Sequence, residues 1–166
     1  MYFGSINVGV GFPLSKNTDF MLSGYYYEES YKLSTYKPVS KSIQISPAVK
    51  FSIFNKEKIS LAIFGGAFYT YDIYRASSME GLYFGTIVSP LLFKSLEPFL
   101  SIRPGLTYVN GNMELEKDGL SMPINKKMGF YLAYYIGFNI LAKKWLSFFI
   151  HHNNYRFIGF GINLKF

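Results

Sequence analysis

Large apolar residues alternate with small or polar residues along most of this chain. The alternation is cleanest over the last nine residues, where every second position is large and apolar: Ile158, Phe160, Ile162, Leu164 and Phe166. A two-residue period is typical of a strand with one apolar and one polar face, and helical spacing is nearly absent. We therefore predict strands at 2–14, 20–31, 42–54, 59–74, 82–93, 98–109, 128–141, 145–152 and 157–166.

The segments between these strands alternate in length. The short turns SKNTD, NKEK, KSLE and AKK alternate with KLSTYKPVSK, RASSME, NGNMELEKDGLSMPINKK and the short NNYR. Tight turns at one end and longer loops at the other are typical of a transmembrane barrel. The sequence therefore predicts an all-β fold, a transmembrane up-and-down antiparallel β-barrel, as a single domain over residues 1–166.

The predicted number of strands is nine, whereas bacterial barrels of this kind have an even number and begin on the periplasmic side. We expect eight to ten strands in the intact protein. Either a signal peptide and one further strand precede the chain, or one hairpin is miscounted. Three prolines inside predicted strands, Pro47, Pro90 and Pro104, each remove a donor from the ladder, and we expect them to mark bulges.

Four charged residues within strands fall on the less apolar face: Lys50, Asp72, Arg103 and Lys165. A Lys or Arg that faces lipid at the midplane costs about 2–4 kcal/mol, so these side chains are predicted to face the lumen. A soluble lipocalin-like barrel is the alternative, but its outer face would need many charges. Only 16% of residues are charged, against roughly 25% in an ordinary soluble domain.

The same parity directs many aromatic side chains inward: Tyr25, Tyr27, Phe64, Phe68, Tyr83, Phe99, Tyr131 and Tyr135. Two interpretations remain open for this interior. The charged residues can line a narrow, anion-preferring pore, or the interior can be filled by its own side chains, as is usual in barrels of about eight strands. The aromatic bulk favours the filled barrel.

Composition excludes several classes of function. The chain has no Cys, which removes disulfides, cysteine-based zinc sites and thiol catalysis. Its net charge of +7 comes from basic residues that are scattered rather than clustered, so nucleic acid is not an expected partner. No Gly-rich phosphate loop precedes a helix, and we predict neither a cofactor nor a metal.

The tail IGFGINLKF resembles the C-terminal assembly signal of bacterial outer-membrane β-barrel proteins, with Phe160, Ile162, Leu164 and Phe166 in the apolar places. The repeated style of ISPAVKFSIFNKEKISLAIFGGAFY is similar to the small porin-like, or outer-membrane β-barrel, families of Gram-negative bacteria. The resemblance covers the whole chain as a pattern and is specific at the tail. It implies a bacterial outer-membrane location, insertion by the barrel-assembly machinery, and contact with outer-membrane lipids and lipopolysaccharide. It implies no single activity, because these families are functionally mixed.

The stretch FFIHHNNYRF contains both histidines and loosely resembles the His-x-Ser-Asn motif of lipid A deacylases. On that match His151 is the base and Asn153 replaces the nucleophile, but an amide has no ionisable oxygen with which to attack an ester. The simpler interpretation is a polar rim, formed by His151, His152, Asn154 and Arg156, that contacts lipid headgroups. Parity places the two histidines on opposite faces, so they are not an obvious metal pair.

These patterns predict an integral outer-membrane protein with a structural or surface-interaction role through its extracellular loops. Residues 110–127 form the longest predicted loop and are the first candidate for partner binding. A narrow channel for small solutes and a lipid A-modifying hydrolase remain as alternatives.

Overall fold

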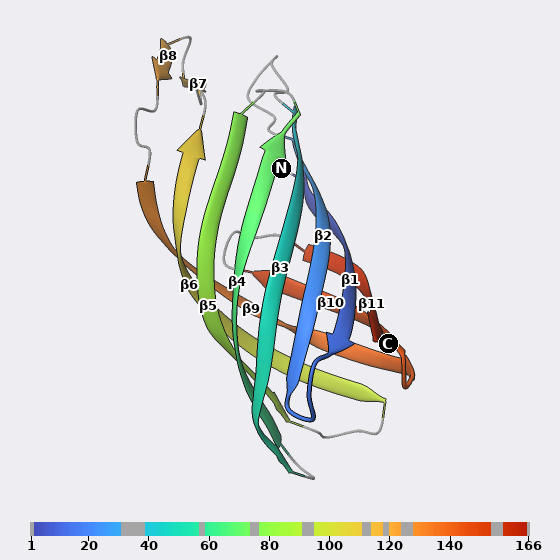
Figure 1. The fold of residues 1–166 in the computed structure, drawn as a ribbon. Coiled ribbons are helices and arrows are strands. Elements are labelled where there is room, and N and C mark those ends of the chain that lie inside the picture. Colours follow the sequence, from blue (N-terminus) through green and yellow to red (C-terminus); the bar gives the residue numbers. More distant parts are fainter. Residues whose placement is uncertain are drawn as a thin grey trace.

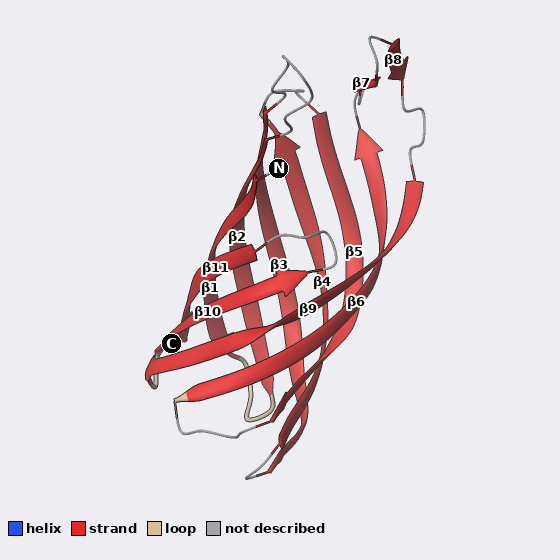
Figure 2. Ribbon diagram, turned by 180° about the vertical axis from the view of Figure 1, so that it is seen from behind, coloured by secondary structure: helices blue, strands red, loops and turns tan. Residues whose placement is uncertain are grey.

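A computed structural model describes residues 2–30, 39–56, 59–73, 77–90, 95–110, 114–117, 120–123, 128–153 and 158–165. Nine of its strands close into a barrel (Figures 1 and 2). They are β1 (Tyr2–Pro13), β2 (Thr18–Ser30), β3 (Val39–Lys56), β4 (Ile59–Asp72), β5 (Ser77–Pro90), β6 (Leu96–Asn110), β9 (Met128–Lys143), β10 (Leu146–Asn153) and β11 (Ile158–Lys165). The prediction of an all-β barrel is confirmed, and each predicted strand overlaps one of these nine.

The remaining two strands form a hairpin of their own. β7 (Glu114–Lys117) and β8 (Leu120–Pro123) pair with each other and not with the barrel, so β6 pairs directly with β9. The hairpin extends beyond the ends of β6 and β9 (Figure 1). We call this end of the barrel the loop end, and the opposite end, where β1 turns into β2 and β9 turns into β10, the turn end. The segment predicted as the longest loop therefore contains a small sheet.

Closure of the barrel differs from the prediction. β1 and β11 pair in parallel, with Gly4 opposite Ile158 and Gly11 opposite Lys165, whereas all other barrel pairs are antiparallel. In an up-and-down order of nine strands the first and last run in the same direction, so they can meet only as a parallel pair. The prediction of a purely antiparallel barrel was wrong at this one seam.

Two of the three prolines interrupt a ladder without causing a bulge. Pairing between β3 and β4 skips the position of Pro47, and pairing between β5 and β6 skips that of Pro104, but the register is the same on both sides of each gap. The missing N–H weakens the ladder locally and no extra residue is inserted. Register shifts occur elsewhere, at Ser52/Phe54 and at Leu146/Ser147, so the prediction of bulges at these prolines was wrong.

β5 begins earlier than predicted. Backbone pairing between β4 and β5 continues to Asp72 opposite Ser77, so the last four residues of RASSME belong to a strand rather than to a loop. Serines at 77 and 78 weaken the apolar alternation there, which is why the pattern did not reveal the strand.

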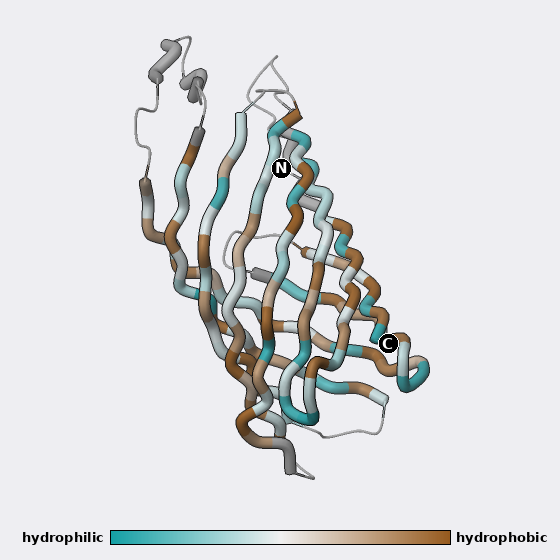
Figure 3. The backbone as a smooth tube through the Cα atoms, in the orientation of Figure 1, coloured by the Kyte–Doolittle hydropathy of each residue, from teal (hydrophilic) through white to brown (hydrophobic). Residues whose placement is uncertain are grey.

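Side chains alternate between an apolar outer wall and a polar and aromatic interior. The outward Phe84 and Phe130 are 67% and 70% exposed, whereas the inward Ser101 is fully buried and Ser5 and Asn7 are nearly so. Figure 3 shows this alternation of hydropathy along the strands. The parity predicted from the sequence therefore describes both faces of the wall.

Inward glycines lie directly opposite inward rings on neighbouring strands. The pairs are Gly66 with Tyr83, Gly81 with Phe68, Gly85 with Phe64, Gly105 with Tyr131, Gly159 with His151 and Gly161 with Phe149. A Cβ atom on Gly66 would lie 2.7 Å from the Tyr83 hydroxyl oxygen, and one on Gly159 would lie 2.6 Å from Nε2 of His151. The absence of a side chain on one strand thus makes room for the ring of the next, and the rings fill the interior.

Candidate functional site

Arg103 lies at the centre of the interior. Its guanidinium carbon is 4.2 Å from the ring centre of Tyr135, 5.0 Å from that of Phe64 and 5.9 Å from that of Tyr83. Tyr25, on β2 across the barrel, also hydrogen-bonds with this guanidinium. Because these rings come from β2, β4, β5 and β9, Arg103 on β6 connects opposite walls. Aromatic faces are favourable partners for a buried cation.

Hydroxyl and amide groups brace the same level of the barrel. The Ser46 hydroxyl oxygen lies 2.8 Å from that of Tyr83 and donates to the Ala67 carbonyl at 3.0 Å. Towards the loop end, Gln44 Oε1 accepts hydrogen bonds from Thr70 and Tyr27, at 3.1 and 3.4 Å. These polar groups therefore satisfy one another, and their side chains project into the mid-section of the interior.

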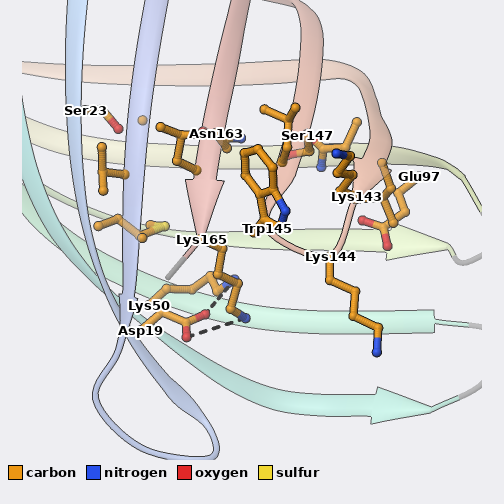
Figure 4. A pocket seen from close by; sticks show the side chains of 18 residues that line it. Asp19, Ser23, Lys50, Glu97, Lys143, Lys144, Trp145, Ser147, Asn163 and Lys165 are labelled. Atoms are coloured by element: carbon orange, nitrogen blue, oxygen red, sulfur yellow. Dashed lines mark ion pairs between the residues drawn. The ribbon is translucent and has the colours of Figure 1, made fainter.

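The predicted lumenal lysines share one carboxylate. The carboxylate of Asp19 forms ion pairs with the ammonium groups of Lys50, at 3.2 Å, and Lys165, at 3.9 Å. These ion pairs connect β2, β3 and β11 (Figure 4). Asp72 lies apart from this group, buried near the loop end. The structure therefore brings Lys50 and Lys165 together, and leaves Asp72 and Arg103 in separate surroundings.

A cavity of about 380 Å³ opens beside this ion-pair group at the turn end. We call it the vestibule; its charged and polar lining comprises Asp19, Ser23, Lys50, Glu97, Asn139, Lys143, Lys144, Ser147, Asn163 and Lys165. Trp145 also lines it, and the Lys143 ammonium lies 5.4 Å from the centre of its ring. The vestibule thus combines open volume with exposed charge, since the side chain of Lys165 is 60% exposed.

The two histidines do not form one site. The buried ring of His151 lies between Phe149, at 5.6 Å and nearly parallel, and Tyr135, at 5.3 Å and edge-on. His152 points outward and is exposed. Asn154 and Arg156 fall outside the described residues. In the part of the chain that the structure describes, no three His, Cys, Asp or Glu side chains are grouped so as to hold a metal ion.

The residues of the C-terminal signal lie on β11. Phe160 and Ile162 point outward and are exposed, Leu164 is half-buried, and Phe166 falls outside the described residues. β11 pairs on one side with β10 and on the other with β1, so its alternating tail completes the barrel wall. Among the described residues, no helix is long and apolar enough to cross a membrane.

No protein-family model matches this chain, and no curated protein matches it. The fold and the interior by themselves define its class: a closed nine-strand β-barrel protein with an apolar outer wall and an interior lined by polar and aromatic side chains.

Proposed function

We propose that this protein is an integral barrel of the bacterial outer membrane. The apolar outer wall is the observation that carries the proposal. Most outward residues near the middle of the strands are large and apolar, for example Leu100, Ile102, Leu132 and Ile136. In water this apolar surface would stay hydrated. In a bilayer lipid covers it, and the free energy of the protein falls by about 25 cal/mol for each Å² of apolar surface removed from water.

The polar groups of the wall also suit this environment. Each barrel strand is hydrogen-bonded to two neighbours, and a closed wall leaves no sheet edge to be satisfied by water. Charged side chains such as Asp19, Lys50 and Arg103 lie inside the barrel instead of on its apolar face. Outer-membrane lipids and lipopolysaccharide are therefore the proposed surroundings, and the barrel-assembly machinery is the proposed partner during insertion.

We further propose a structural or surface-interaction role through the loop end, rather than conduction. The side chains around Arg103 close the interior at mid-height, and the β7–β8 hairpin extends past the barrel as a surface that a partner can contact. A lipid A hydrolase is not favoured, because His151 points into the interior while an acyl chain would lie against the outer wall.

The test is single-channel recording in planar bilayers. Folded wild-type protein is expected to show no open events. A double variant, Arg103→Ala with Tyr83→Ala, removes the central cation and one of its rings, and it is expected to conduct because the interior opens between Phe64 and Tyr135. Circular dichroism must show that both proteins retain strand structure. Open events in the wild type would overturn the filled-barrel role in favour of a channel, and a folded but silent double variant would contradict the assignment of the plug.

A further inference from the structure

The vestibule carries an excess of positive charge. Four lysines, Lys50, Lys143, Lys144 and Lys165, line it together with two carboxylates, Asp19 and Glu97. Within the described residues, the only ion pairs in this lining are those of Asp19. Two cationic charges are therefore left uncompensated around one cavity.

The single carboxylate of Asp19 neutralises only one of the two positive charges of Lys50 and Lys165. The Asp19 side chain is 17% exposed and lies closer to Lys50, at 3.2 Å, than to Lys165, at 3.9 Å. The Lys165 side chain remains 60% exposed at the cavity. A lysine ammonium has three donors, so Lys165 can accept a further anionic partner while it keeps its contact with Asp19.

The other walls supply neutral donors and an apolar surface. Asn139, Ser147 and Asn163 line the cavity on β9, β10 and β11, and Trp145 stands at the turn between β9 and β10 (Figure 4). Amide and hydroxyl groups bond the oxygens of an anion, and an indole ring packs against its organic part. The volume of about 380 Å³ lies within the range of small-molecule sites.

We propose that the vestibule is a binding site for a phosphate group. A phosphate monoester carries about −1.5 to −2 charges at neutral pH, which matches the net positive charge of the lining, and lysine binds phosphate as a point charge. The phosphate can belong to a free phosphate monoester or to an anionic phospholipid headgroup of the adjacent leaflet, whose phosphodiester carries one negative charge. A headgroup source is consistent with Trp145 and Lys143 at the mouth, since such side chains occur at headgroup depth in membrane proteins.

Trp145 provides the readout, because it is the only tryptophan in the chain. Glycerol phosphate is titrated into protein folded in a neutral detergent while the emission of Trp145 is recorded, and calorimetry follows the same titration. A saturable change is expected in the wild type. Lys165→Gln should weaken binding about tenfold, as expected for the loss of one charge-assisted contact.

Lys16→Gln is the matched control. Lys16 lies in the exposed turn between β1 and β2 and does not line the vestibule, so its loss removes the same net charge and should leave binding unchanged. Lys143→Gln is a second test variant in case Lys165→Gln fails to fold, which strand circular dichroism will reveal. If Lys16→Gln and Lys165→Gln weakened the binding of glycerol phosphate equally, the effect would come from the net charge of the protein and not from the vestibule. That result would overturn the proposal.

Nanodiscs distinguish the two sources of phosphate. The wild type and the Lys165→Gln variant are each placed in a bilayer of anionic phospholipid. If the Trp145 emission then differs between the two proteins, and glycerol phosphate no longer binds to the wild type, the headgroup is the ligand. If glycerol phosphate binds equally well in that bilayer, the free ester is the ligand. The absence of a saturable signal, by fluorescence and calorimetry, with both ligands would overturn the proposed site, while leaving the proposed membrane role untouched.

Discussion

Ile102→Arg is expected to lower the free energy of unfolding in lipid vesicles by about 2–4 kcal/mol, the cost of an arginine that faces lipid near the midplane. Ile102 lies near the middle of β6, points outward and is 45% exposed. If the outer wall faces lipid, the new guanidinium must lose its hydration or drag water into the bilayer. The measurement is equilibrium unfolding in urea of protein folded into vesicles.

Leu14→Arg is the matched control for this substitution. Leu14 is also apolar and exposed, but it lies just beyond β1 at the turn end, where the cost of a charge falls to about 0–1 kcal/mol. In a water-soluble barrel both substitutions would be nearly neutral, within about 0.5 kcal/mol, since each residue would already face solvent. Equal stabilities of the two variants would therefore count against the membrane-spanning wall.

Gly85→Ala is expected to destabilise the barrel by about 1–3 kcal/mol, the usual cost of overpacking a filled interior. A Cβ atom at this position would collide with the backbone carbonyl of Ile102 and would lie 2.7 Å from Cζ of the Phe64 ring and 3.2 Å from Cγ of Arg103. Since the carbonyl belongs to a neighbouring strand, the collision can be relieved only by movement of the wall. Urea unfolding in vesicles measures the loss.

The control for this variant is Gly24→Ala on β2. A Cβ atom on Gly24 meets no atom within 4 Å, and its backbone conformation is one that any residue adopts. The change should stabilise the protein by about 0.4–1 kcal/mol, because alanine has fewer unfolded conformations to lose than glycine. The two substitutions are therefore expected to change the free energy of unfolding in opposite directions. A neutral Gly85→Ala would show that the inward rings do not need the space of the facing glycines.

Most of the wall could be predicted from the sequence, because a two-residue period reports directly on which side of a strand a residue lies. Residues such as Ile43, Ile45 and Phe130 follow the period for a full strand, and their outward positions agree with it. β5 was placed too short, since Ser77 and Ser78 carry no apolar signal. Local pattern therefore fixes a strand only where one of its faces must be apolar.

Features that depend on the pairing of distant strands could not be predicted in this way. The parallel seam between β1 and β11 and the facing of Gly85 with Phe64 require the register of the closed barrel. Asp19 was assigned to a turn and so missed as the partner of Lys50 and Lys165. Asp19 lies at the same alternate positions as Met21 and Ser23, and this spacing is the signal from which its inward orientation could have been predicted. The vestibule is lined by residues from seven strands and from the turn between β9 and β10, and no local pattern describes it.

The contact between the outer wall and lipid can be measured most directly with a spin label, because the chain has no cysteine of its own. A nitroxide on Ile102→Cys, in vesicles, is compared with one on Ser23→Cys, which lines the vestibule. The Ile102 label is predicted to collide more with oxygen, which concentrates in lipid, than with a water-soluble nickel chelate, and the Ser23 label is predicted to show the reverse. An Ile102 label that the nickel chelate reaches as freely as it reaches the Ser23 label would contradict a barrel whose outer wall faces the membrane.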